Sequence, residues 1–188
     1  MNIGVDIDGV IADADTLFRR RMKEVFKRDF PRSKVKCFKY EECFKFSEYE
    51  FKILCSLFLD EDLWMAMKPI KGAQAALKTL SKKNKIIIAT SRPPEVKDVT
   101  VKWLKRYRIP YDEIYFTLDE KHLLPKVLKY PFDYFLEDHP YFASKLADLG
   151  IRVLLFSYPW NEKVREHLKI TRISGWKEVL DIIKNNDS

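Results

Sequence analysis

The sequence has little of what staples a chain together or anchors it in a membrane. Its three cysteines fall in one short region, in an odd number and without CxxC spacing, so neither a disulfide framework nor a zinc site is expected. No stretch reaches the roughly 18 apolar residues of a membrane-spanning helix, and the chain does not open with a basic segment followed by an apolar one. We therefore expect a soluble, cytoplasmic protein with no membrane partner.

The sequence also lacks internal repeats and low-complexity segments, and hydrophobic residues make up 46% of its 188 positions. That content suffices for one well-packed core, or for a core with a modest insertion. The formal net charge of +7 favours an anionic partner such as a phosphate ester, a nucleotide or a nucleic acid. A solvated basic surface explains the charge equally well, and a monomer and a homodimer both stay open.

Short apolar runs recur along the chain with helical stretches between them. The runs are continuous rather than alternating, which is typical of parallel strands buried on both faces. Residues 72–83 and 95–107 have the pattern of the crossover helices that such strands need. The fold class is therefore α/β, with a doubly wound parallel sheet. The predicted strands are residues 3–5, 85–89, 114–116, 134–136, 152–156 and 170–173, followed by a closing helix in 177–184.

One interval is too long for a simple crossover. About 60 residues separate the first strand from the helix near residue 72, whereas a crossover needs roughly a dozen. We predict a helical subdomain inserted at 17–67, within a core made of 1–16 and 68–188. Its apolar residues recur at helical spacing, as in Phe18, Met22, Val25 and Phe26, and again in Phe51, Leu54, Leu57 and Phe58.

Acidic side chains follow the first and the fourth predicted strands. Asp6 and Asp8 come after the first strand, two apart, so that in extended chain they point the same way. Glu137 and Asp138 come after the fourth. In an open parallel sheet, ligands bind beyond the carboxyl ends of the strands. Because four converging carboxylates repel one another, we expect a hard divalent ion between them, and Mg²⁺ is the best candidate.

Each of these features has an ordinary structural alternative. A lone Asp-x-Asp often caps a turn, a hydroxyl pair before a helix is usually an N-cap, and paired acids after a strand are often a solvated loop. In this sequence a third strand end also carries polar side chains, because Thr90 and Ser91 follow the second predicted strand. Their joint occurrence, all at carboxyl ends, is far more specific than any one of them.

The order of these features resembles a known superfamily. DIDGV at 6–10, the apolar strand IIIAT ending at Thr90, and YFLED ending at Glu137 and Asp138 are similar to three motifs of the haloacid dehalogenase (HAD) superfamily of aspartate-nucleophile phosphotransferases. The resemblance implies a HAD-like α/β core with a small helical cap and a Mg²⁺-dependent phosphomonoesterase that works through an aspartyl-phosphate.

A narrower resemblance is to the 5'(3')-deoxyribonucleotidase group. It rests on DGVIAD, on a helical cap after the first motif, on LWMAMKPIKGAQAAL and on TSRP. It implies a nucleoside monophosphate as the substrate; another small phosphate ester, such as a sugar phosphate, is the alternative. A third hypothesis, a nucleic-acid-binding module with a basic surface, accounts neither for the acids at the strand ends nor for their order.

The resemblance assigns roles to the four acids. Asp6 is the expected nucleophile, and Asp8 the acid and base that protonates the leaving group and then activates water. Mg²⁺ is expected to be held by Asp6, by the backbone carbonyl of Asp8 and by Asp138. Glu137 is the alternative ligand, ranked second because the shorter Asp138 suits a tight octahedral site.

Thr90 and a lysine are expected to hold the remaining phosphoryl oxygens. The segment 117–138 contains three lysines, and we favour Lys121, because it follows directly after a predicted strand. Lys126 is the rival, and Lys129 is expected to be surface.

Ser91 and Arg92 follow the second motif. Ser91 is expected either to contact the ester or the sugar of the substrate or to cap a helix. Arg92 is expected either to pair with the phosphate or to lie exposed near a helix start.

The inserted helices are expected to supply the walls of the pocket. Phe18, Phe44 or Phe46 is a candidate for stacking on a base, and sequence does not choose among them. The basic run 19–21 attracts anions or is a solvated helix face. His139 is expected to brace the loop before a helix rather than to act in catalysis.

Overall fold

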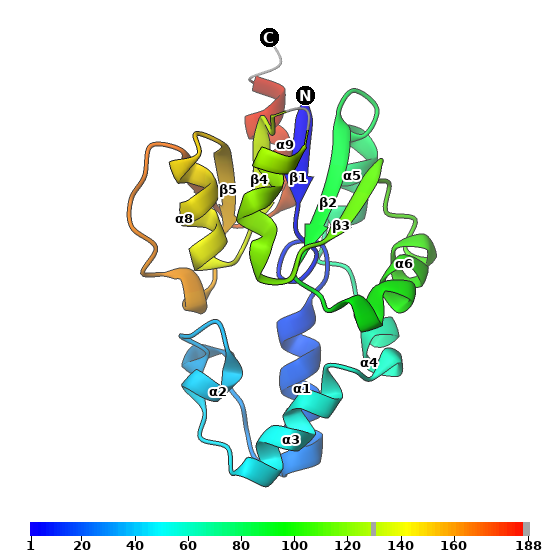
Figure 1. The fold of residues 1–188 in the computed structure, drawn as a ribbon, viewed down its shortest axis with the longest axis vertical. Helices are drawn as coiled ribbons and strands as arrows, with labels where there is room; N and C mark the ends of the chain where they lie inside the picture. Colours follow the sequence, from blue (N-terminus) through cyan, green and yellow to red (C-terminus); the bar gives the residue numbers. More distant parts are fainter. Residues whose placement is uncertain (129–130, 186–188) are drawn as a thin grey trace.

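The computed structural model describes residues 1–128 and 131–185, in which six parallel strands form a sheet with helices on both faces (Figure 1). The strand order is β3-β2-β1-β4-β5-β6, so the chain winds outward from β1 in one direction and then from β4 in the other. The strands are β1 (Asn2–Val5), β2 (Lys85–Thr90), β3 (Glu113–Phe116), β4 (Tyr134–Glu137), β5 (Arg152–Phe156) and β6 (Ile170–Ile173). The predicted doubly wound α/β fold is confirmed.

Alternate residues of each strand enter different halves of the core. In β2, Ile86 and Ile88 pack with the helices of one face, whereas Ile87 and Ala89 pack with those of the other. Both faces are therefore dry, which is why the apolar runs in the sequence are continuous. The first face is covered by α5 (Ala73–Leu80), α6 (Lys97–Arg106) and α9 (Trp176–Asn185), and the second by α7 (Leu124–Val127) and α8 (Pro140–Asp148).

The segment between β1 and α5 forms further helices, which lie beyond the carboxyl ends of the strands, opposite to the two termini (Figure 1). We call residues 14–66 the α1–α4 segment. Its helices are α1 (Ala14–Phe26), α2 (Tyr40–Cys43), α3 (Glu48–Leu57) and α4 (Glu61–Ala66).

Local capping explains where these helices begin. The carboxylate of Asp13 accepts a hydrogen bond from the backbone of Thr16 at the start of α1. Ser47 and Glu50 form a capping box at the start of α3. The apolar stripe of α3 is shorter than its spacing predicts: Leu54 is buried, but Phe51 is 42% exposed, because only the second half of the helix packs against the core.

Among the described helices, none is both long and apolar enough to cross a bilayer.

Candidate active site

The first residue after β1 is Asp6, and its position is set by the sheet. Its backbone N–H donates to the carbonyl of Leu136 at 3.0 Å, which prolongs the pairing of β1 with β4 by one residue. The carboxylate is buried, 6% exposed. Burial, with smaller contributions from Glu137 and Asp8, raises the pKa of Asp6 to about 7, while Lys121 opposes the rise.

The chain turns sharply after Asp6. Gly9 has φ of +77°, and a Cβ atom there would lie 2.0 Å from the carboxylate of Asp138. Only glycine tolerates both conditions, so the turn and the acid after β4 are adapted to each other. The carbonyl of Gly9 accepts a hydrogen bond from the hydroxyl of Tyr158 at 2.9 Å, which ties the turn to the loop after β5.

Glu137 ends β4 with both oxygens in use. One accepts from the backbone N–H groups of Asp138 at 3.1 Å and His139 at 3.0 Å. The other accepts from the ammonium of Lys121 at 3.0 Å. The side chain is completely buried. Glu137 is therefore engaged in holding its neighbours.

Asp138 differs from Glu137 in having an oxygen without a partner. Its Oδ2 accepts from the indole N–H of Trp160 at 3.1 Å, while its Oδ1 is buried and has no hydrogen-bond partner among the described residues. Burial first, and then the nearby Asp6 and Glu137, raise the pKa of Asp138 well above its ordinary value. An unpartnered buried oxygen of this kind calls for a ligand.

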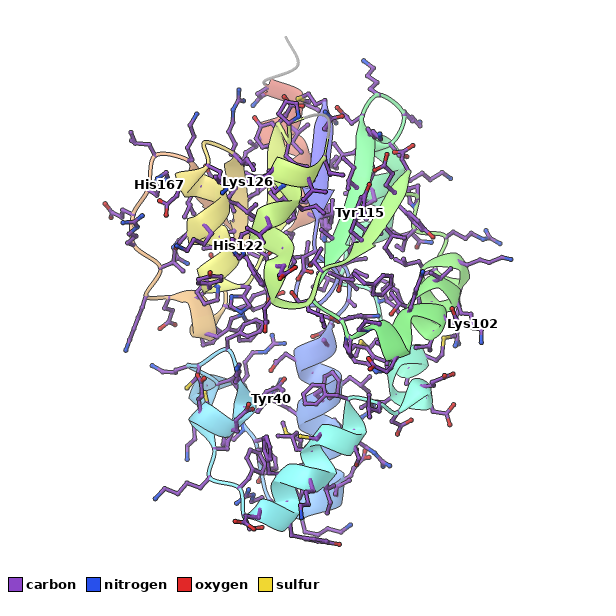
Figure 2. The ribbon with its side chains drawn as sticks, in the orientation of Figure 1. Tyr40, Lys102, Tyr115, His122, Lys126 and His167 are labelled. Atoms are coloured by element: carbon purple, nitrogen blue, oxygen red, sulfur yellow. The ribbon has the colours of Figure 1, made fainter. Side chains whose placement is uncertain are left out.

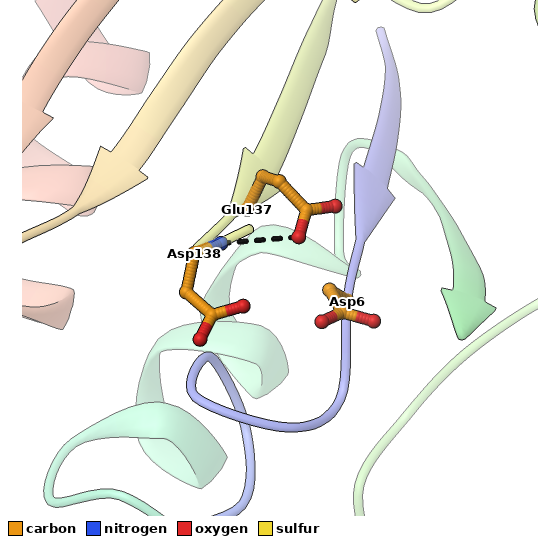
Figure 3. Close-up of side chains that lie close together, drawn as sticks. All are labelled: Asp6, Glu137 and Asp138. Carbon is orange, nitrogen blue, oxygen red and sulfur yellow. Dashed lines mark hydrogen bonds between the residues drawn. The ribbon is translucent and has the colours of Figure 1, made fainter. Parts of the chain in front are cut away.

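Carboxylate oxygens of Asp6, Glu137 and Asp138 lie within 4.8 Å of one another (Figure 3). We call these residues the three-acid cluster. Lys121 Nζ lies 2.7 Å from Asp6, so one described lysine faces three acids. Clustered oxygen donors with excess negative charge suit a hard divalent cation. Because Asp138 has an oxygen without a partner and Glu137 has none, Asp138 is the better candidate ligand.

Lys121 has the position expected of the favoured lysine. Its side chain is 1% exposed. Burial alone disfavours its charge, but the carboxylates of Asp6 and Glu137 outweigh this and raise the pKa of Lys121. Lys126, the rival, lies in α7 (Figure 2). It lines a second cavity with His122. It does not line the cavity at Asp6. Lys129 lies outside the described residues.

Asp8 stands apart from the three-acid cluster. Its two oxygens accept from Arg92, at 2.7 Å from Nη2 and 2.8 Å from Nε. The Arg92 side chain is 1% exposed and that of Asp8 31% exposed. Arg92 is therefore neither an exposed arginine nor free to grip a phosphate, since its charge is already paired.

The two hydroxyls at the end of β2, those of Thr90 and Ser91, are arranged differently from each other. Thr90 is fully buried, and its Oγ1 accepts from the backbone N–H of Arg92 at 3.2 Å. Ser91 lines the cavity, and its Oγ is buried without a hydrogen-bond partner among the described residues. Ser91 therefore does not act as a helix cap, and its hydroxyl is available to a ligand.

A cavity of about 440 Å³ opens at these residues and extends to the α1–α4 segment. The aromatic side chains of its wall are Phe18, Phe38, Tyr40, Phe58, Trp64 and Trp160.

Of the three predicted aromatic candidates, one reaches the cavity. Phe18 lines it and packs edge-on against Trp64, with ring centroids 5.5 Å apart. Phe44 and Phe46 instead pack on Phe30, at 5.0 and 5.8 Å between centroids. These two stabilise the α1–α4 segment itself.

The basic run 19–21 is engaged within the protein. Arg19 pairs with Asp15 at 2.9 Å, and Arg20 and Arg21 pair with Glu24 on the same helix. None of the three lines the cavity.

His139 caps α8 as the expected brace. Its Nδ1 accepts from the backbone N–H of Tyr141 at 3.1 Å. Its ring packs on Phe38 of the α1–α4 segment, with centroids 3.7 Å apart. Burial, aided by Lys121, lowers the pKa of His139 to about 3, so its ring is neutral near pH 7.

Sequence reasoning missed several residues of this site. Trp160 and Tyr158, whose rings stack at 4.3 Å, come from the loop after β5. That loop follows a strand end, which was the available signal. Asp15, which lines the cavity wall, lies two residues after the helix cap Asp13 and carried no signal of its own.

Comparisons with known proteins agree with this geometry. The family model for 5' nucleotidase, deoxy (pyrimidine), cytosolic type C protein matches residues 1–186. A nucleotidase of Clostridium acetobutylicum is 29% identical over 191 residues, which cover 97% of this chain and 93% of its own.

Solved structures resemble the fold. A haloacid dehalogenase-like hydrolase of Streptococcus pneumoniae has a TM-score of 0.70 at 15% identity, with 97% of each chain covered. A Bacillus subtilis protein, solved bound to magnesium, has a TM-score of 0.64 at 14% identity, with 97% of this chain and 98% of its own covered. At such identities the likeness establishes the fold alone.

Proposed function

Because the chain belongs to the 5' nucleotidase, deoxy (pyrimidine), cytosolic type C family and is therefore a phosphoric monoester hydrolase, we propose that it is a Mg²⁺-dependent 5'(3')-nucleotidase that acts on nucleoside monophosphates. The observation that carries the proposal is the three-acid cluster with its unpartnered Asp138 oxygen, at the end of a cavity with an aromatic wall. The description of the family as cytosolic supports a cytoplasmic location.

In the proposed domain organisation, residues 17–67 form a cap over a core made of 1–16 and 68–188. The cavity between them supports this, because its walls come from both parts. Phe18 lines the cavity together with Phe58 and Trp64, on which it packs, and these rings form an apolar aromatic wall against which a base can pack. Asp15, Lys39 and Glu41 also line the cavity, but the number of aromatic side chains in its wall leads us to favour a nucleotide over a sugar phosphate.

Mg²⁺ would be held by Asp6, by the backbone carbonyl of Asp8 and by Asp138. When bound, it would neutralise charge on the phosphoryl oxygens. Glu137 would hold Lys121 in place rather than ligate the ion, since both of its oxygens already accept hydrogen bonds.

Asp6 would attack phosphorus in line and form an aspartyl-phosphate while the ester P–O bond breaks. Asp8 would give its proton to the leaving ester oxygen and then take one from the water that hydrolyses the aspartyl-phosphate. Lys121 and the hydroxyls of Thr90 and Ser91 would hold the phosphoryl oxygens.

The test is phosphate release from 5'- and 3'-nucleoside monophosphates and from sugar phosphates, with Mg²⁺ and with EDTA. We expect Mg²⁺-dependent release, highest on nucleotides, and a loss of at least about a thousandfold in Asp6→Asn, because the nucleophile is removed. Asp13→Asn is the matched control, since asparagine also caps helices well and Asp13 does not line the cavity. Wild-type activity in Asp6→Asn would refute the assignment, and a preference for sugar phosphates would refute the substrate class.

A further inference from the structure

The guanidinium of Arg92 is held on several sides inside the protein. Besides the two bonds to Asp8, its Nη1 donates to the hydroxyl of Thr100 at 3.1 Å, and that hydroxyl donates to the carbonyl of Val96 at 2.7 Å. Nη2 lies 3.5 Å from the sulfur of Met67. All three nitrogens of the group thus have protein partners.

Aromatic rings complete the enclosure. The Arg92 guanidinium lies over the ring of Trp64, 4.4 Å from its centroid, and 5.9 Å from that of Trp103. The indole N–H of Trp103 donates to the carbonyl of Met67 at 2.9 Å. A cation between these rings gains cation–π attraction, and it has little freedom to turn toward a substrate phosphate.

The carboxylate partner of this enclosed group is more exposed than the guanidinium itself. Asp8 directly precedes the turn at Gly9, its side chain is 31% exposed, and it lines the cavity. An unpaired aspartate in that setting would sample several rotamers. The two-bond contact with a planar guanidinium fixes both the position and the plane of the carboxylate, and each oxygen keeps a further lone pair for a proton.

We propose that Arg92 is a positioning residue that holds the Asp8 carboxylate in the orientation needed to exchange a proton with the substrate. The inference rests on the proposed function of the site. In the first step the Asp6 oxygen forms a bond to phosphorus, the ester P–O bond breaks, and the proton of Asp8 goes to the leaving oxygen. In the second step water attacks phosphorus, its proton goes to Asp8, and the bond to Asp6 breaks.

This role differs from phosphate binding in what it does to different leaving groups. A nucleoside leaves as an alkoxide and needs the proton of Asp8, whereas p-nitrophenolate is a good leaving group and departs without one. A residue that orients Asp8 therefore matters for the first ester much more than for the second. A residue that binds phosphate, or that merely stabilises the fold, matters equally for both.

The experiment measures single-turnover release of nucleoside and of p-nitrophenolate by the Mg²⁺-loaded enzyme, in wild type, Arg92→Met and Arg92→Lys. Methionine keeps a long apolar side chain between the rings and removes the fork. Since general acid catalysis contributes about 10²- to 10⁴-fold, we expect release of nucleoside to fall by about 10- to 100-fold in Arg92→Met. Release of p-nitrophenolate should fall by less than about threefold. Arg92→Lys should lie between, because an ammonium cannot form both bonds.

Arg165→Met is the matched control, since it removes an arginine–aspartate pair, with Asp148 at 2.6 Å, and neither residue lines the cavity at Asp6. Both rates should stay unchanged. If Arg92→Met does not fold, Thr100→Val takes its place, because it removes the hydroxyl that holds Nη1 of Arg92. The measured quantity is again the loss in nucleoside release relative to the loss in p-nitrophenolate release. Equal losses on the two esters, or a raised KM with unchanged kcat, would overturn the proposal. If wild type releases neither product, the proposed function fails first and this inference with it.

Discussion

The three-acid cluster and a second charge cluster lie on the same cavity, yet they contain carboxylates and cations in different proportions. In the first, three carboxylates share one described lysine, Lys121, and one oxygen has no partner. In the second, Asp15 pairs with Arg19 at 2.9 Å and with Arg32 at 2.7 Å and accepts from Tyr40 at 3.2 Å, and Arg32 also lies 3.4 Å from Asp13. We call the latter the Asp15 cluster.

The difference separates a cluster with an unpartnered carboxylate oxygen from one whose hydrogen bonds stabilise the fold. In the Asp15 cluster both carboxylate oxygens are satisfied, and the group ties α1 to the loop before α2 and to α2 itself. Burial, with Asp15 adding to it, raises the pKa of Tyr40, so that its hydroxyl keeps its proton. In the three-acid cluster negative charge is in excess, and an added cation or an added proton relieves it.

The largest contrast should come from removing one cation from each cluster. Lys121→Met leaves three buried carboxylates without a described lysine and should lower the free energy of unfolding by about 3–5 kcal/mol, as well as abolish activity. Arg19→Met leaves Arg32 and Tyr40 on Asp15 and should cost about 1–2 kcal/mol. Urea unfolding with EDTA measures both. Equal losses would mean that the two clusters do not differ as described.

The pH dependence of stability should also separate them. The pKa of Asp6 is raised from 3.8 to about 7 by burial, so between these values the folded state binds more protons than the unfolded state. The contribution of Asp6 to the free energy of unfolding is then fully present below about pH 4. It is lost as pH rises to about 7, which lowers the free energy of unfolding by a few kcal/mol. Asp6→Asn should flatten this fall in urea titrations of the metal-free protein. A stability that rises with pH over that interval, in wild type relative to Asp6→Asn, would contradict the sign.

The smallest effect should be the response to the ion. Mg²⁺ at 100 times its Kd should raise the free energy of unfolding by about 2.7 kcal/mol if it binds the folded state alone. Asp138→Asn should remove this increment, because it replaces the carboxylate that carries the unpartnered oxygen by a neutral amide. Asp15→Asn should lower the starting stability and keep the increment. Thermal melts with and without Mg²⁺ give the comparison, and a lost increment in both variants would count against the assigned ligand.

Much of the sheet and part of the site could be predicted from the sequence. The apolar runs predicted each strand to within about two residues, and the strand order places the ends of β1 and β4 side by side. That Lys121 rather than Lys126 meets Asp6 depends on the path of the chain from β3 to β4, which one sequence does not reveal. The role of Glu137 was hidden for the same reason, since its hydrogen-bond partners were unknown.

The packing of side chains was less predictable. Helical spacing placed Phe18 and Phe51 alike on apolar stripes, yet one is 3% and the other 42% exposed. Spacing says which residues share a face of a helix and not whether another element covers that face. From the sequence, Arg92 was expected either to pair with the phosphate or to lie exposed near a helix start. In the structure it is bonded to Asp8 instead.

The sequence by itself determined the strands, the turn at Gly9 and the acids that follow β1 and β4, because these depend on neighbouring residues and on the alternation of a strand. Tertiary structure alone decided which cation faces each carboxylate: Lys121 faces Asp6, and Arg92 faces Asp8 across 84 positions of the chain. Charge pairing acts through distances of a few ångströms in space, and separation along the chain does not set those distances.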